Sequence, residues 1–198
     1  MSSSRHHFST STRMPRGVRG WFKAGKTTGF RLLFWMLGLL CCPSLTHAET
    51  LAEYQIKAAF LYNFLAFTEW PAEVGNTITL CVYGPDPFGE DLNKMQGKGL
   101  GVRSLTVKRV NSVDGLQSCQ AVFITRPVMS NLRRVLDNLG DRPVLTVADS
   151  QDAALQGVAL NMSMDQNKVT FEANLAAARG NRLNLSSKLL RLATKVFQ

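Results

Sequence analysis

Residues 51–71, LAEYQIKAAFLYNFLAFTEWP, form the stretch on which the fold depends. Thr50 and Glu53 have the spacing of a helix capping box. Pro71 disfavours helical geometry in the residue before it, so it marks the end of the segment. The pattern therefore predicts a helix that begins at Thr50 and ends close to Pro71.

This helix is apolar on more than one side. Between Ala58 and Phe67 only Asn63 interrupts the apolar residues, and a helix of that kind must be covered by more than one neighbour. We expect a core helix whose second face meets another chain. Candidate residues for a partner or dimer contact, including two from a strand near the C-terminus, are Phe60, Phe64, Phe67, Trp70, Phe171 and Glu172. For the last two, the plainer interpretation is a core phenylalanine and a solvated glutamate.

The segment before this helix has the pattern of an export signal. Residues 1–31 carry seven Lys or Arg and no acid, and the apolar run 32–42 follows. Thr46, His47 and Ala48 then form a small-x-small cleavage site, which predicts a cleavable secretory signal over 1–48 with cleavage near Ala48. The start is at Met1 or at Met14. The apolar run is too short for a membrane-spanning helix, which needs about 20 residues.

Removal of the signal changes the charge and the chemistry. The whole chain has 23 basic and 14 acidic residues, and the mature chain keeps 16 basic and 14 acidic ones. A net charge so close to zero does not favour nucleic acid. All three histidines also lie within 1–48, so we expect no histidine-based catalysis or metal site in the mature protein. We predict no cofactor, no metal and no enzymatic activity.

Two cysteines remain in the mature chain, Cys81 and Cys119. An even pair in an exported protein favours a disulfide. A loop of about 39 residues closed in this way would contribute roughly 4 kcal/mol. Two buried free thiols are the alternative, and an exposed, strained bridge would act as a redox switch rather than as a structural link.

A phosphate-binding motif is present by pattern and is rejected. Gly20, Gly25, Lys26 and Thr27 satisfy G-x-x-x-x-G-K-[ST]. A working loop of this type lies between a buried strand and a packed helix. Here it lies between a polar basic region and the export signal, so we expect no nucleotide binding.

Strands alternate with helices along the remainder of the chain. This order predicts a single α/β domain over 49–198, with helices on both faces of a mainly parallel or mixed sheet and an antiparallel hairpin near the C-terminus. The order of the strands cannot be read from the sequence. Strands are expected at 77–83, 102–110, 119–124, 144–147, 158–162 and 168–174, and helices from Asp86, over 130–139, from Asp149 and over 186–197.

At this point the mature chain resembles a known family, the YfiR-like periplasmic proteins, along nearly its whole length. The resemblance depends on four stretches in the same order and at the same spacing. They are KAAFLYNF with EWP (57–71), LCVYG with DPFG (80–89), CQAVFI (119–124), and VTFEANL with LSSKLL (169–190).

The resemblance implies a function that composition does not. Members of the family act in the periplasm as repressors that bind the periplasmic sensor region of an inner-membrane diguanylate cyclase. They thereby restrain cyclic di-GMP synthesis and biofilm formation. An outer-membrane lipoprotein can sequester the repressor, and family members form homodimers. They can carry two disulfides; Cys81–Cys119 matches one of them, and the second has no counterpart here.

The sequence leaves two alternative functions open. A periplasmic ligand-binding domain serving another membrane sensor, such as a histidine kinase, would use the turns at 84–87 and at Asp149 and Ser150, which should lie at strand C-terminal ends. An enzyme would need an acid–base pair such as Asp149 with Asp152, or Glu90 with Asp91. Acids at helix starts are more commonly caps than catalysts.

Overall fold

The computed structural model describes residues 45–198, which form one compact unit. The phosphate-loop pattern at 20–27, both possible start residues and most of the predicted signal lie outside the described residues.

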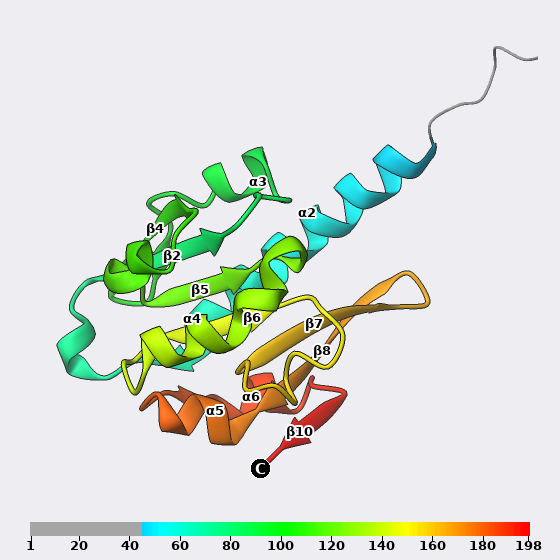
Figure 1. Ribbon diagram of the computed structural model, residues 1–198. Helices are drawn as coiled ribbons and strands as arrows, with labels where there is room; N and C mark the ends of the chain where they lie inside the picture. Colours follow the sequence, from blue (N-terminus) through cyan, green and yellow to red (C-terminus); the bar gives the residue numbers. More distant parts are fainter. Residues whose placement is uncertain (1–44) are drawn as a thin grey trace, which may run out of the picture. The chain divides into compact units, whose positions relative to one another are not determined.

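An eight-stranded mixed sheet forms the centre of the domain (Figure 1). Its strand order is β10-β8-β7-β6-β5-β2-β4-β3. The five strands from β7 to β4 run parallel, while β7 and β8 form the antiparallel hairpin expected near the C-terminus. The predicted α/β class is therefore confirmed. The strands are β2 (Thr77–Tyr83), β3 (Gly99–Leu100), β4 (Arg103–Val110), β5 (Ala121–Ile124), β6 (Leu145–Ala148), β7 (Leu160–Asp165), β8 (Lys168–Asn174) and β10 (Lys195–Phe197).

Each face of the sheet has its own apolar core. Side chains alternate along a strand, so Leu80 and Val82 of β2 enter one core while Cys81 and Tyr83 enter the other. The first core is covered by α2 (Leu45–Ala66), α3 (Glu90–Asn93), α5 (Leu175–Gly180) and α6 (Ser187–Leu190). The second is covered by α4 (Leu132–Leu139) and the 3₁₀ turn η3 (Asp114–Ser118).

The bounds of α2 differ from the predicted helix. It begins at Leu45 instead of Thr50, so Thr50 lies inside the helix and is not its cap. It ends at Ala66, because Thr68–Glu69 (β1) pairs antiparallel with Asn184–Leu185 (β9) in a separate two-stranded sheet. The Thr68 hydroxyl donates a hydrogen bond to the last turn of α2 at the Phe64 carbonyl, 2.7 Å away.

The prediction of a single C-terminal helix over 186–197 is wrong. The helix α6 ends at Leu190, and β10 adds a parallel strand to the edge of β8. The Thr194 backbone N–H and hydroxyl both donate to the Phe171 carbonyl, at 2.8 and 3.0 Å. These bonds attach the chain to the sheet edge. The short helix predicted from Asp149 is a series of turns, and α5 was not predicted.

The disulfide between Cys81 and Cys119 is present. It joins the middle of β2 to the residue two positions before β5. Cys81 is 0% and Cys119 is 2% exposed, so the bridge lies inside the second core. This burial favours the structural role over the redox-switch alternative, because thiol–disulfide exchange requires access to a sulfur atom.

Candidate functional site

A completely buried lysine lies at the centre of the most unusual polar site in the described residues. Lys57 is on α2, and its side chain is 0% exposed. Its Nζ is 2.6 Å from Asp149 Oδ2, and the Asp149 side chain is also 0% exposed. Lys57 further pairs with Glu53, one turn earlier on α2. Such burial is tolerable because each charge has a partner of opposite sign.

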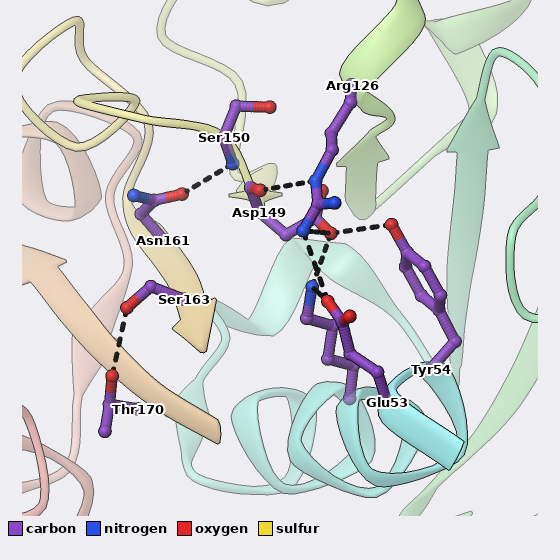
Figure 2. A network of polar contacts seen from close by, with 9 residues as sticks. Glu53, Tyr54, Arg126, Asp149, Ser150, Asn161, Ser163 and Thr170 are labelled. Atoms are coloured by element: carbon purple, nitrogen blue, oxygen red, sulfur yellow. Dashed lines mark hydrogen bonds and ion pairs between the residues drawn. The ribbon is translucent and has the colours of Figure 1, made fainter. Parts of the chain in front are cut away.

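Two more side chains complete the group (Figure 2). The Tyr54 hydroxyl donates to Asp149 Oδ2 at 2.8 Å. The Arg126 guanidinium lies 3.1 Å from Asp149 Oδ2 and 3.2 Å from Glu53 Oε1, and its Nε donates to the Asp149 carbonyl at 3.0 Å. We call Glu53, Tyr54, Lys57, Arg126 and Asp149 the α2 ionic cluster. It holds two positive and two negative charges, so it is neutral as a whole.

The surroundings keep these groups in their paired states. Partial burial acts to raise the pKa of Glu53, but the hydrogen bond and charge of Lys57 and the charge of Arg126 outweigh it, so this pKa lies below its ordinary value. Burial, followed by the charge of Asp149, raises the pKa of Tyr54. Near neutral pH, Glu53 is therefore ionised and Tyr54 keeps the proton that it donates to Asp149.

The cluster occupies the edge of the sheet where α/β proteins commonly bind ligands. Asp149 directly follows β6, and Arg126 lies two residues after β5, so both are at the carboxyl ends of parallel strands. Here α2 itself supplies the groups that pair with them. The Asp149 carboxylate, which the ligand-binding alternative assigned to a ligand, is thus already paired within the chain.

The other predicted ligand turn, at 84–87, is also occupied by the chain. A Cβ at Gly84 would lie 2.4 Å from Thr125 Oγ1, so only glycine fits between the ends of β2 and β5. The Asp86 carboxylate accepts from the Phe88 N–H at 2.8 Å and pairs with Arg109 at 2.8 Å. Asp86 and Asp149 Oδ2 are therefore engaged within the chain, whereas Asp149 Oδ1 and Ser150 Oγ are buried without a hydrogen-bond partner.

One member of each carboxylate pair considered for catalysis has a structural partner as well. Asp149 belongs to the α2 ionic cluster, and Asp91 pairs with Lys94 at 2.7 Å. Within residues 51–198, no three His, Cys, Asp or Glu side chains are grouped so as to hold a metal ion.

The six candidate contact residues separate into two groups. Phe64 and Phe171 are 0% and 1% exposed, and their rings pack against each other with centroids 4.9 Å apart. They are core residues and have no surface for a partner. Their prediction as partner contacts is therefore corrected. Phe67 is 38% exposed. The remaining three are half-buried and reach the surface: Phe60, Trp70 and Glu172.

Between Leu51 and Ala66, the solvent side of α2 is notable for its lack of charge. Five exposed residues at helical spacing follow one side of this part of the helix, and none of them is charged, because Glu53 and Lys57 turn inward. Ile56 remains 44% exposed. We call this surface the outer face of α2; it comprises Ala52, Gln55, Ile56, Ala59 and Asn63.

A shallow hollow of about 550 Å³ lies between β1, β9 and α6. Its lining combines apolar side chains with one acid and one base. The lining residues are Phe67, Glu69, Asn184, Leu185, Ser186, Ser187, Lys188 and Leu190.

The α2 ionic cluster has little signal in the sequence. Lys57 directly precedes an apolar run, and nothing in that pattern predicts that its side chain is buried. The available signal was Glu53 four residues before Lys57, a spacing that places the two side chains together on a helix. The third partner, Asp149, is 92 residues away along the chain, and no local pattern connects it to α2.

Comparison with known proteins identifies the family. The family model described as YfiR/HmsC-like matches residues 54–194, more than half of the chain. The chain belongs to the YfiR/HmsC-like family. The YfiR/HmsC-like match includes Tyr54, Lys57, Arg126 and Asp149 together with both cysteines, and it ends immediately before β10.

Two solved structures resemble the chain more distantly. One is the ABC domain from Streptococcus pneumonia in complex with L-Trp, with 10% identity and a TM-score of 0.49; the match covers 71% of this chain and 62% of that one. The other is a conserved domain protein from Vibrio cholerae, with 11% identity and a TM-score of 0.43, covering 72% and 60%. The chain thus spans about three fifths of each. At these identities neither likeness assigns a ligand or an activity to this YfiR/HmsC-like chain.

Proposed function

We propose that this protein is a non-enzymatic periplasmic regulator. It binds the periplasmic region of an inner-membrane diguanylate cyclase and restrains the synthesis of cyclic di-GMP, and so limits biofilm formation. Membership of the YfiR/HmsC-like family is the observation that carries this proposal. An outer-membrane lipoprotein that sequesters the protein would relieve the restraint.

Three further features support a periplasmic regulator. The Cys81–Cys119 disulfide suits an oxidising compartment. The sequence predicts a cleavable export signal over 1–48. Of the four carboxylates considered for catalysis, Asp149 and Asp91 are paired with cations of the chain itself.

The first test is genetic. Deletion of the gene in its native bacterium is expected to raise cellular cyclic di-GMP, because the cyclase loses its repressor. Deletion of the gene together with that of the partner cyclase is expected to return the level to that of the cyclase deletion alone. Cyclic di-GMP would be measured by mass spectrometry of cell extracts. An unchanged level in the single deletion, under growth conditions in which the cyclase is expressed, would contradict the proposal.

We also propose that the outer face of α2 is where two copies of the protein meet. Covering this exposed, uncharged helix face with a second subunit would require no desolvation of a charged group. Its alanines would allow close approach of a second helix. Phe60, Phe67 and Trp70, which lie on or directly after the same helix, would contribute at its border.

Ala59→Arg is expected to convert a dimer into a monomer, because it places a long charged side chain in the middle of the outer face of α2. Ala59 is exposed, so the fold of each subunit should be retained, and any fall in melting temperature should reflect only the lost subunit contact. The mass in solution would be measured by light scattering coupled to size exclusion. Ala176→Arg is the matched control, because Ala176 is also an exposed alanine and lies on another helix, α5. A dimer that survives Ala59→Arg would place the contact elsewhere.

A further inference from the structure

The antiparallel hairpin of β7 and β8 extends past the strand that flanks it. β6 pairs with β7 at Leu160 and Asn161, whereas the pairing of β7 with β8 continues to Asp165. Figure 1 shows the turn of this hairpin standing away from the rest of the sheet. Among the described residues, no strand other than β8 pairs with 162–165, and no loop forms a backbone hydrogen bond to them. This side of β7 is therefore an open sheet edge.

One hydrogen bond establishes which backbone groups point to this edge. The Phe171 carbonyl accepts from the Thr194 N–H at 2.8 Å, on the side of β8 away from β7. In an antiparallel ladder, two opposite residues direct their backbone groups either toward each other or both away. Met162 is opposite Phe171, so its N–H and C=O point away from β8. The direction alternates along a strand, and Met164 therefore points the same way. We call the side of 162–165 that carries these groups the open edge of β7.

The other side of the hairpin is protected, and the open edge of β7 is not. On β8, the strand β10 covers Glu172–Asn174, and the part that remains free begins with Lys168. A lysine on an edge strand hinders the addition of another strand. Residues 162–164 of β7 contain no charge and no proline, and their one-to-one register with β8 has no bulge. The devices that usually prevent strand addition are thus missing from these three residues.

The side chains along the open edge of β7 indicate what an added strand must carry. Met162 belongs to the first core, and Met164 follows on the same face of the hairpin and is 38% exposed. The opposite face is polar, and the hydroxyls of Ser163 and Thr170 lie 2.9 Å apart on it (Figure 2). Asp165 is exposed and forms no ion pair with any described residue. A matching strand alternates apolar and polar residues and places a Lys or Arg beside Asp165.

We propose that the open edge of β7 binds an extended segment of the cyclase's periplasmic region by strand addition. Only an extended polypeptide backbone supplies donors and acceptors at the spacing of a strand edge, so a lipid surface or a small ligand does not match it. The proposal rests on the proposed function, and it names how the regulator holds that partner.

A second copy of this chain matches the open edge of β7 less well. The six residues of β7 include no Lys or Arg, so two antiparallel β7 strands would place no cation opposite Asp165. The free part of β8 does carry Lys168. However, pairing β7 of one copy with β8 of the next is head-to-tail, and it would build open filaments instead of a closed dimer.

The test uses the protein recovered from the periplasm and the full-length partner cyclase purified in detergent. Met164→Pro removes an N–H from the open edge and keeps the ladder to β8, because that N–H is not part of the ladder. It should weaken binding of the cyclase by about tenfold or more. Asp165→Asn should weaken binding by about threefold, as expected for one exposed ion pair. Affinities would be measured by biolayer interferometry with the cyclase immobilised.

Lys195→Pro is the matched control. Lys195 is exposed on β10, at the opposite edge of the sheet, and its N–H points outward because that of Thr194 is bonded to β8. This variant should bind the cyclase within about twofold of the unaltered protein. Both proline variants should keep the melting temperature to within about 2 °C.

A second measurement does not depend on any variant. Amide hydrogen exchange of the unaltered protein should slow at Met162 and Met164 when the cyclase is bound, because these N–H groups then donate to the added strand. Unchanged exchange there, or equal affinities of Met164→Pro and Lys195→Pro, would overturn the inference while the proposed function remained. Absence of any binding by the unaltered protein would overturn both. Conversion of a dimer into a monomer by Met164→Pro, seen by light scattering, would assign the open edge to a second copy and would also overturn the inference.

Discussion

Replacement of Lys57 by methionine is expected to lower the free energy of unfolding by about 3–5 kcal/mol. Methionine has nearly the same length as lysine and is more apolar. Its added contribution to the hydrophobic core would, by itself, raise the free energy of unfolding. The loss arises from Asp149, whose side chain is 0% exposed and would keep its charge without its closest cation. In a domain of this size the melting temperature should fall by about 10 °C.

A second variant separates charge pairing from packing. Lys57→Met combined with Asp149→Leu removes both members of the buried pair, while Glu53 and Arg126 can still pair at 3.2 Å. The double variant should recover much of the stability that the single variant loses. Lys168→Met, at an exposed lysine beside the β7–β8 turn, should change stability by less than about 0.5 kcal/mol. If Lys57→Met were as stable as Lys168→Met, the α2 ionic cluster would not support the fold.

Parts of the fold that depend on neighbouring residues could be predicted from the sequence. The first predicted strand matches β2, Thr77–Tyr83, residue for residue. Its β-branched and apolar residues favour a strand, and Gly84, with φ near +100°, ends it at a point where a side chain would clash. The hairpin of β7 and β8 was predicted for a similar reason, because polar residues separate two strand-forming runs.

Elements whose partners are distant in the chain were predicted poorly. Val196 and Phe197 continue the apolar spacing of α6, and on local pattern alone they extend the helix. They form β10 because the edge of β8 offers hydrogen bonds from 172 to 174. In the same way, the pairing of β1 with β9 ends α2 earlier than the local pattern predicts. Local pattern cannot show this pairing, because β9 is more than a hundred residues away along the chain. Helix propensity is a weak preference that tertiary pairing of this kind can exceed.

The same limit explains the candidate site. Aromatic residues on α2 were proposed as contacts because the helix is apolar all round, and the structure places Phe64 in the core and Phe60 at its border. Which side of α2 faces outward depends on where the sheet lies. The lysine at position 57 favours the wrong side. A lysine usually marks the solvent side of a helix. Here it marks the buried side, because Asp149 lies at the end of β6 beneath it.

Removal of the disulfide is the second change for which we expect a large effect. Cys81→Ala with Cys119→Ala should lower the free energy of unfolding by about 4 kcal/mol, the chain-entropy value for a loop of this length. The two cysteines are 38 residues apart, so the unfolded chain gains much freedom when the link is lost. Thermal unfolding should show a decrease of about 10 °C.

The burial of the bridge leads to a second, independent prediction, which concerns how fast the bridge is reduced. Because both cysteines are almost fully buried, a reductant added to the native protein should reduce the bridge only as fast as the protein unfolds. Mass spectrometry of the unreduced, alkylated protein should find no modified cysteine before unfolding and two after reduction in denaturant. Rapid reduction of the native protein would instead show that the second core opens around β2. In that case Cys81–Cys119 would be able to act as a redox switch, and its contribution to stability would vary with the redox state of the compartment.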